Sequence, residues 1–243
     1  MELRFARWEF FRPLGGRVIS YRVLDLLNLK QEDRLCDICC GEAGTLTLVD
    51  QPLAEVYGVD ISTKALEKAS RTLEGRNFHL RQADIREMPF DSCYFDKLFA
   101  QDPDVFLYPD KQRSMDEISR VTRTGGRFVL QTYCATSNLQ QYERDETDRI
   151  LRNMGYPYTD VVDIDCLRVL GVQSGFSVVE SQDLHEVYFQ DNLRMIENLG
   201  RNWERIRQDD EEQTHNLREL LYWEKHLFSK KAWSGILLVM EKS

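Results

Sequence analysis

Residues 35–44, LCDICCGEAG, join an apolar segment to a run of small residues. Three cysteines, Cys36, Cys39 and Cys40, fall within five consecutive positions of this stretch. Two interpretations compete. The stretch is either a thiol site for a metal or for redox chemistry, or a loop that leads from a strand into a helix and approaches a nucleotide-like ligand. The choice between them decides the class of fold.

A thiol site has little support in the rest of the sequence. A structural zinc site needs about four Cys or His ligands at short spacings, whereas Cys93, Cys134 and Cys166 are isolated. Cys36 and Cys39 form a CxxC pair, but the pair lies within an apolar strand pattern, and buried thiols are usually inert. We therefore expect no bound metal and no redox role.

The pattern of apolar residues around this stretch is typical of an α/β fold. Short apolar segments alternate with helical patterns, so the sheet should be mostly parallel with right-handed connections. Seven strands are expected, over 34–40, 55–61, 78–84, 95–101, 127–133, 177–184 and 233–241. Helices are expected over 45–50, 62–74, 110–122, 137–155, 165–176, 192–208 and 215–229, and a turn at Gly125–Gly126. We predict a Rossmann-like sheet with helices on both faces.

Composition excludes several classes of function. The chain has 243 residues, 42% of them hydrophobic and 30% charged, and no apolar run approaches the roughly 20 residues of a membrane span. Its net charge of -9 argues against nucleic acid as a partner, because phosphate binding needs a surplus of Lys and Arg. Residues 1–16 lack the apolar core of a signal peptide, so we expect a cytoplasmic protein with reduced cysteines.

Three aspartates lie where consecutive predicted strands end. Asp37 comes just before the small residues, Asp60 ends the second strand and Asp84 ends the third. The carboxyl ends of parallel strands meet at one edge of an open sheet, where ligands bind and a carboxylate can accept hydrogen bonds from ribose hydroxyls. The sequence therefore predicts a site for a ligand that contains a nucleoside.

The identity of that ligand separates three functions. Gly41 and Gly44 fit half of the NAD fingerprint, so an NAD-type Rossmann oxidoreductase is one alternative. Glu42 would repel a diphosphate, however, and favours a cationic ligand such as S-adenosylmethionine (SAM), which has no phosphate and carries a sulfonium and an ammonium. A protein that binds SAM without catalysis is the other alternative, because Cys39 and Ala43 could signal a degraded loop.

Four segments carry a family resemblance. LCDICCGEAG, VYGVDIS, QADIREMPFDSCYFD and EISRVTRTGGRFVL resemble, in order and spacing, the motifs of the class I SAM-dependent methyltransferases. The likeness is greatest to the small-molecule branch, which includes quinone-biosynthesis and sarcosine/dimethylglycine enzymes, and it covers about residues 15–133. Cys39 and Ala43 stand where that family usually has glycine.

The resemblance implies a fold, a reaction and a set of ligand contacts. It implies that the last strand is antiparallel, and that a methyl group passes from SAM to an N, O or C atom of a small molecule by in-line displacement, which leaves S-adenosylhomocysteine (SAH). It also implies which residues hold each part of SAM: the methionine part by Asp37, Cys39 and Gly41, the ribose by Asp60, the adenine by Ile61, Asp84 and Ile85, and the space beside the methyl group by Gln101.

The acceptor side is less well defined by the sequence. No motif in the sequence marks a catalytic base, and Tyr133 and His185 are the candidates for contact with the acceptor. We expect a single domain over 1–243 with an amino-terminal lid over about 1–20 that includes Trp8, Phe10 and Phe11. Helical insertions over about 137–160 and 190–230 should form a cap over the sheet edge. The oligomeric state stays open.

Overall fold

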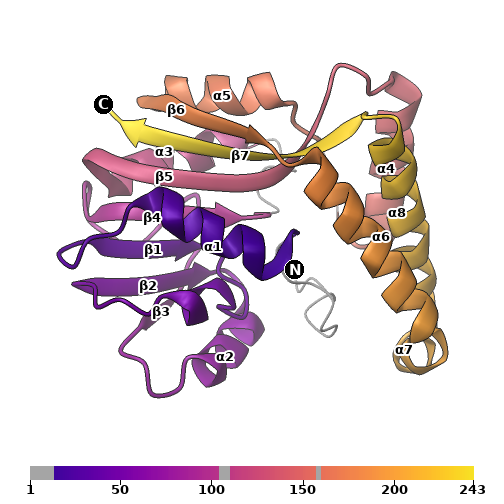
Figure 1. The fold of residues 1–243 in the computed structure, drawn as a ribbon, viewed down its shortest axis with the longest axis horizontal. Coiled ribbons are helices and arrows are strands. Elements are labelled where there is room, and N and C mark those ends of the chain that lie inside the picture. The colour runs from indigo at the N-terminus through magenta and orange to yellow at the C-terminus, as the bar shows by residue number, and fades with distance from the viewer. Residues whose placement is uncertain (1–13, 104–109, 157–159) are drawn as a thin grey trace.

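The computed structural model describes residues 14–103, 110–156 and 160–243. Its strands form a seven-stranded sheet in the order β3-β2-β1-β4-β5-β7-β6 (Figure 1). The strands are β1 (Arg34–Ile38), β2 (Glu55–Asp60), β3 (His79–Gln82), β4 (Phe95–Gln101), β5 (Thr122–Ala135), β6 (Phe176–Asp183) and β7 (Trp233–Lys242).

The directions of the strands place several carboxyl ends at one edge. Strands β1 to β5 pair in parallel, and β7 pairs antiparallel to both β5 and β6. Asp37 lies opposite Gly58 of β2 and Phe99 of β4, so the last residues of these three strands lie close together. The predicted fold class, a Rossmann-like and mostly parallel sheet with an antiparallel last strand, is confirmed.

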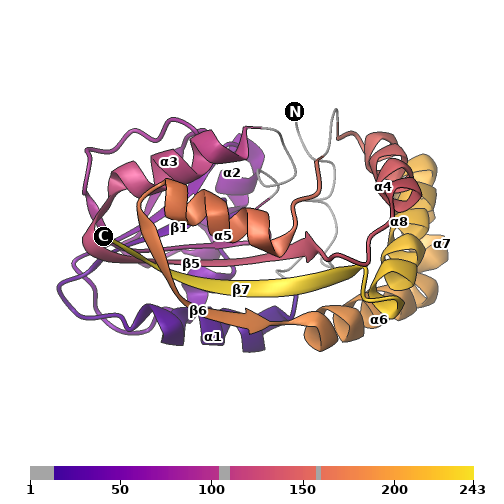
Figure 2. The same ribbon diagram turned by 90° about the horizontal axis from the view of Figure 1, so that it is seen from above.

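Helices cover both faces of the sheet. On one face, α1 (Gly16–Leu27), the short 3-10 helix η2 (Thr45–Leu48) and α2 (Thr63–Thr72) share an apolar core that includes Leu27, Leu46 and Ala69. On the other face, α3 (Lys111–Val121) and α5 (Ile164–Gln173) bury Ile118 and Leu167. Figure 2 shows α1 on one side of β5 and β7, and α3 and α5 on the other.

Four further helices, which we call the cap helices, lie beyond the carboxyl ends of the parallel strands. They are α4 (Gln141–Asn153), α6 (His185–Arg201), α7 (Trp203–Asp209) and α8 (Glu211–Ser229). In Figure 1 the arrowheads of β1 and β4 point toward the side on which α6, α7 and α8 lie. None of the described helices has both the length and the apolar composition needed to cross a lipid bilayer.

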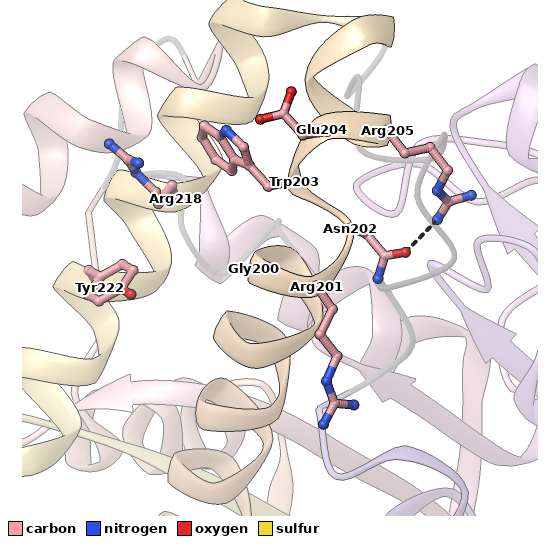
Figure 3. A pocket seen from close by; sticks show the side chains of 8 residues that line it. All are labelled: Gly200, Arg201, Asn202, Trp203, Glu204, Arg205, Arg218 and Tyr222. Carbon is pink, nitrogen blue, oxygen red and sulfur yellow. Dashed lines mark hydrogen bonds between the residues drawn. The ribbon is translucent and has the colours of Figure 1, made fainter.

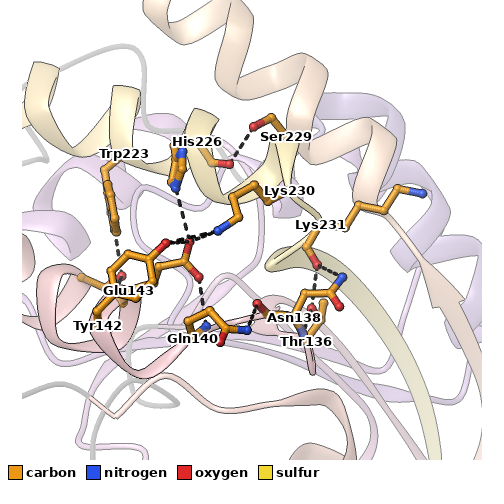
Figure 4. Close-up of polar contacts among 11 residues, drawn as sticks. Thr136, Asn138, Gln140, Tyr142, Glu143, Trp223, His226, Ser229, Lys230 and Lys231 are labelled. Carbon is orange, nitrogen blue, oxygen red and sulfur yellow. Dashed lines mark hydrogen bonds and ion pairs between the residues drawn. The ribbon is translucent and has the colours of Figure 1, made fainter.

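Contacts between α4 and the end of α8 hold the cap helices together (Figure 4). The side chain of Glu143 is fully buried and accepts hydrogen bonds from Lys230 and His226. Its other oxygen accepts from the backbone N–H of Gln140 and so closes a capping box at the start of α4. Trp223 of α8 donates to Thr147 at 2.9 Å.

Two local expectations from the sequence are wrong. Gly125 and Gly126 do not form a turn before the fifth strand but lie within β5, where its pairing moves from Phe95 with Thr122 to Lys97 with Arg127. A Cβ at Gly126 would lie 2.7 Å from the Arg123 carbonyl oxygen, so this irregularity needs glycine. Helix α6 begins at His185 and not at 192, because the Asp183 carboxylate accepts from the backbone N–H of His185 at its first turn.

The expected amino-terminal lid stays a prediction. Trp8, Phe10 and Phe11 lie outside the described residues. Residues 16–20, the end of the expected lid, form the first turns of α1.

Candidate functional site

The small residues after β1, positions 39–44, form a loop with an unusual backbone. Cys39, Gly41 and Ala43 have φ values of 57°, 54° and 61°. This left-handed region costs residues other than glycine about 1–2 kcal/mol. Cys39 and Ala43 therefore occupy positions of glycine type, as the loop interpretation requires. A Cβ at Gly41 or Gly44 would meet no atom within 4 Å, so the loop has open space beside it.

Burial favours the neutral form of two thiols near this loop, Cys36 and Cys40. Cys36 is fully buried, and burial, followed by the nearby Asp37, raises its pKa well above the usual range. The pKa of Cys40 is raised by the same causes in the same order. A neutral thiol neither attacks nor binds a metal. All six cysteines are free, and the part of the chain that the structure describes contains no group of three or more His, Cys, Asp or Glu able to hold a metal ion.

Asp37 is the most unusual of the three aspartates. Its residue is 4% exposed, and burial, followed by Asp60, raises its pKa well above the usual range. Within residues 14–103, 110–156 and 160–243, no hydrogen-bond donor or cation contacts its carboxylate. Because a buried carboxylate without a partner is costly, this position is suited to a positively charged ligand group.

Asp60 ties the loop to the start of α2. Its Oδ2 accepts from the backbone N–H of Gly41 at 2.8 Å, and its Oδ1 accepts from that of Ser62 at 2.9 Å. Ser62 in turn caps α2 by accepting from the backbone N–H of Ala65. The next residue, Ile61, is 61% exposed and presents an apolar side chain beside this carboxylate. The pair offers acceptors for hydroxyls and an apolar surface for a flat ring.

Asp84 forms an ion pair with Arg86. The Nε and Nη2 atoms of Arg86 donate to both of its oxygens, with a shortest distance of 2.6 Å, and hydrogen bonding to Arg86 lowers the pKa of Asp84. The next residue, Ile85, is 7% exposed and packs in the core. A ligand donor would have to share this carboxylate with Arg86.

Gln101, at the end of β4, has a fixed side-chain amide. Its Oε1 accepts from Thr45 Oγ1 at 2.6 Å and from Ser20 Oγ at 3.3 Å, and its Nε2 donates to Gln131. Gln101 and Gln131 are both buried, 9% and 0% exposed. Because Thr45 is the first residue of η2, the amide of Gln101 connects the small-residue loop to the interior of the sheet edge.

The chain of hydrogen bonds continues to α6. The Nε2 of Gln131 donates to the Tyr188 hydroxyl at 2.9 Å, and that hydroxyl donates to Asp102 Oδ1 at 2.7 Å. Burial, followed by Asp102, raises the pKa of Tyr188 well above its usual range. The other oxygen of Asp102 accepts from the backbone N–H of Leu14 at 2.7 Å. These contacts bring the end of β4, the start of α1 and α6 together.

The two candidates for the acceptor side, Tyr133 and His185, both contact Trp233. The ring of Tyr133 is half-buried and stacks on Trp233, with centroids 5.5 Å apart. His185 is not a solvated loop residue, because it is half-buried at the first position of α6 with its Nδ1 3.2 Å from the Trp233 carbonyl oxygen. Both side chains therefore lie where β5, β7 and α6 meet.

Sequence reasoning missed a polar pair between α6 and α8. Asn192 is 1% exposed, and its Nδ2 donates to the Leu221 carbonyl at 3.1 Å and to Glu224 Oε2 at 3.0 Å. Burial raises the pKa of Glu224 to about 7, and the nearby Asp102 contributes to the shift. The available signal was on α6, where Tyr188 and Asn192 lie four residues apart and so share one face of the helix.

A pocket of about 680 Å³ lies at the far end of the cap helices (Figure 3). The guanidinium of Arg218 lies 4.8 Å from the centre of the Trp203 ring. Tyr222 also lines the pocket and is 54% exposed. In Figure 1, α7 lies far from the ends of β1 and β2, so this pocket is separate from the three aspartates.

The comparison with family models agrees with the class of protein that the fold and the site indicate. A family model described as "Methyltransferase domain" matches residues 29–209. Because the match covers more than half of the chain, the protein belongs to the methyltransferase-domain family.

Curated relatives act on small molecules of different kinds. The chain is 30% identical over 112 residues to a demethylmenaquinone methyltransferase of Staphylococcus saprophyticus, which covers 44% of this chain and 48% of that protein. It is 25% identical over 173 residues to the 27-O-demethylrifamycin SV methyltransferase of Amycolatopsis mediterranei, which covers 69% of this chain and 62% of that protein. The chain spans less than two thirds of the length of each relative.

Solved structures share the fold. The Haemonchus contortus phosphoethanolamine N-methyltransferase 2, in complex with phosphomonomethylethanolamine and SAH, superposes with a TM-score of 0.80 at 17% identity over 98% of this chain and 56% of that one. The cyclopropane synthase MmaA2 from Mycobacterium tuberculosis gives a TM-score of 0.78 at 15% identity over 93% of this chain and 84% of that one.

Proposed function

We propose that the protein is a SAM-dependent methyltransferase that transfers a methyl group to an N, O or C atom of a small-molecule acceptor and releases SAH. The observation that carries this proposal is the small-residue loop, in which Cys39 and Ala43 take up glycine conformations. The loop lies next to the buried carboxylate of Asp37, which has no partner among the described residues. The family match supports the same activity.

The residues at the sheet edge fit SAM in charge and in shape. Asp37 can compensate the ligand's ammonium, because its buried carboxylate has no cation among the described residues. Asp60 keeps lone pairs for ribose hydroxyls beside its two backbone donors, and Ile61 offers apolar surface to the adenine. The full proposed set is Asp37, Cys39, Gly41, Asp60, Ile61, Asp84, Ile85 and Gln101.

When bound, SAM supplies an electrophilic methyl group on a sulfonium. The contribution of the chain to the reaction is positioning, which can remove several kcal/mol of the barrier when the reacting atoms are held in line. The amide of Gln101 suits this task because Thr45 and Gln131 fix its orientation. We propose that Tyr133 or His185 contacts the acceptor, since both lie at the junction with the cap helices.

The two alternatives have weaker support. An NAD-type oxidoreductase was disfavoured by the charge of Glu42, but Glu42 forms an ion pair of 2.6 Å with Lys68, which reduces that repulsion. The matched family gives this alternative no support. A SAM-binding protein without catalysis is disfavoured because the loop keeps its glycine-type backbone at both substituted positions.

We also propose the setting in which the protein works. The net charge of -9 favours a small-molecule acceptor over nucleic acid. Six free thiols suit a reducing compartment, so we propose a cytoplasmic location. We propose that residues 1–243 act as one domain, because the cap helices pack on the sheet through α6 and β7.

Titration calorimetry with SAM, SAH and NAD tests the proposal directly. SAM and SAH should bind, and NAD should not. Asp60→Ala should weaken SAM binding more than about tenfold, because ribose hydroxyls lose a charged acceptor. Turnover is then measured over amines, phenols and thiols. Binding of NAD in place of SAM, or unchanged SAM affinity in Asp60→Ala, would contradict the assignment.

A further inference from the structure

The pair formed by Asn192 and Glu224 lacks the donors that its oxygens require. Asn192 Oδ1 is buried and has no hydrogen-bond partner among the described residues, although the nitrogen of the same amide makes two bonds. Both atoms that contact this nitrogen are acceptors, which fixes the orientation of the amide. The Asn192 amide therefore offers one oxygen that needs a donor, next to the nitrogen that contacts Glu224.

Glu224 also lacks a positive partner. In the described part of the chain, no Lys, Arg or His forms an ion pair with its carboxylate, and Asn192 is its hydrogen-bond donor. Glu224 is half-buried and keeps some accessible surface. Burial without a cation is costly for a carboxylate, which is consistent with its raised pKa of about 7.

The pair is placed toward the sheet edge that carries the proposed SAM site. Asp102 directly follows Gln101 and is close enough to Glu224 to act on it electrostatically. Asn192 lies one helical turn after Tyr188, whose hydroxyl contacts Asp102. The carboxylates of Asp102 and Glu224 therefore face the same region between β4, α6 and α8.

We infer that Glu224 and Asn192 bind the nitrogen of a positively charged amine acceptor, with Asp102 adding negative charge beside them. An ammonium brings several N–H donors, and these satisfy both the carboxylate and the unpartnered amide oxygen. It also brings a positive charge, which Glu224 does not have beside it among the described residues. An alcohol supplies one donor and no charge, and a carboxylic acid is repelled. The inference rests on the proposed function, because it names the acceptor class of the same site.

Matched ligands test this inference on the full chain. With SAH at saturating concentration, calorimetry is carried out with 2-phenylethylamine, 2-phenylethanol and phenylacetate, and with butylamine, butanol and butyrate. In each set we expect the amine to bind at least about tenfold more tightly than the alcohol and the acid not to bind. Glu224→Gln should remove this preference for the amine and leave SAH affinity unchanged.

A control on the same helix separates recognition from general effects. Glu219 lies on the surface of α8 and pairs with Arg149 at 2.6 Å, so Glu219→Gln should leave both amine and SAH binding unchanged. Equal binding of amine and alcohol, no binding of either amine, or an unchanged preference in Glu224→Gln would overturn the inference. Failure of SAH itself to bind would instead overturn the proposed function.

Discussion

The hydroxyl of Tyr188 donates a 2.7 Å hydrogen bond to Asp102, which joins helix α6 to the residue that follows strand β4. The same hydroxyl accepts from Gln131, so it lies in the middle of the polar chain that begins at Thr45 and Gln101. Tyr188 is fully buried, and its ring lies against Gly235, where a Cβ would come within 2.5 Å of it. The position of α6 is thus fixed by a contact inside the proposed site.

Tyr188→Phe should destabilise the protein by about 1–3 kcal/mol, because it removes two hydrogen bonds of a buried hydroxyl, one from Gln131 and one to Asp102. Urea denaturation measures this loss. Tyr222→Phe is the matched control, because Tyr222 is 54% exposed and should change stability by less than about 0.5 kcal/mol. Equal effects of the two substitutions would contradict the network.

Asp37→Asn should make the free protein more stable and weaken its binding of SAM. The folded-state pKa of Asp37 is raised, so this group adds stability at low pH and loses it as the pH rises through that pKa. At pH 7 the asparagine variant does not bury a charged carboxylate, so its Tm should exceed that of the wild type. Its SAM affinity should fall about tenfold, because the ammonium loses a charged acceptor. An unchanged Tm would show that burial of this charge costs nothing.

Cys39→Gly should keep SAM binding and should not destabilise the protein. Relief of the left-handed φ of 57° is worth about 1–2 kcal/mol, which outweighs the roughly 0.5–1 kcal/mol of entropy that glycine costs. Cys39→Leu should lose SAM affinity by steric exclusion. Calorimetry and thermal melts of both variants check this. A Cys39→Gly protein that binds SAM but has no turnover would show that the thiol has a chemical role.

Glu143 should make the stability of the protein sensitive to acid (Figure 4). Burial alone would raise its pKa, but hydrogen bonds from Lys230, Gln140, Tyr142 and His226 outweigh burial and lower the pKa to about 2. The stability from this group is complete above its ordinary value of 4.5 and is lost as the pH falls toward 2. Glu143→Gln should therefore have a lower Tm than the wild type at pH 7. Its Tm should also fall less than that of the wild type between pH 4.5 and 2, which thermal melts across that range measure.

The sheet could be predicted from the sequence because each strand is a short apolar run beside a helical pattern. All seven strands were expected. Gly125 and Gly126 were misread, because a pair of glycines has the same local pattern in a turn and in a strand irregularity. Only pairing with β4 distinguishes the two. The start of α6 was missed because its first seven residues include Tyr188 and Phe189, which also suit a strand.

The proposed SAM residues could be selected from the sequence because they lie at or close to the carboxyl ends of strands, in segments that resemble the motifs of a known family. The side chains between α6 and α8 could not. Asn192 and Glu224 are 32 residues apart and meet only when two helices pack together. Arg86 was missed for a different reason, because its contact with Asp84 depends on the conformation of the turn between them. Contacts that depend on packing leave no periodic signal in one sequence.

The place of β7 between β5 and β6 has a consequence for the order of folding. During synthesis β6 and the helices α6, α7 and α8 are all made before β7, yet β6 pairs with β7 in the sheet. On the ribosome, strands β1 to β5 can therefore pair before β7, the strand that pairs with β6, has been made. The sheet beside the cap helices is therefore complete only after the ten-residue strand β7 has paired with both β5 and β6.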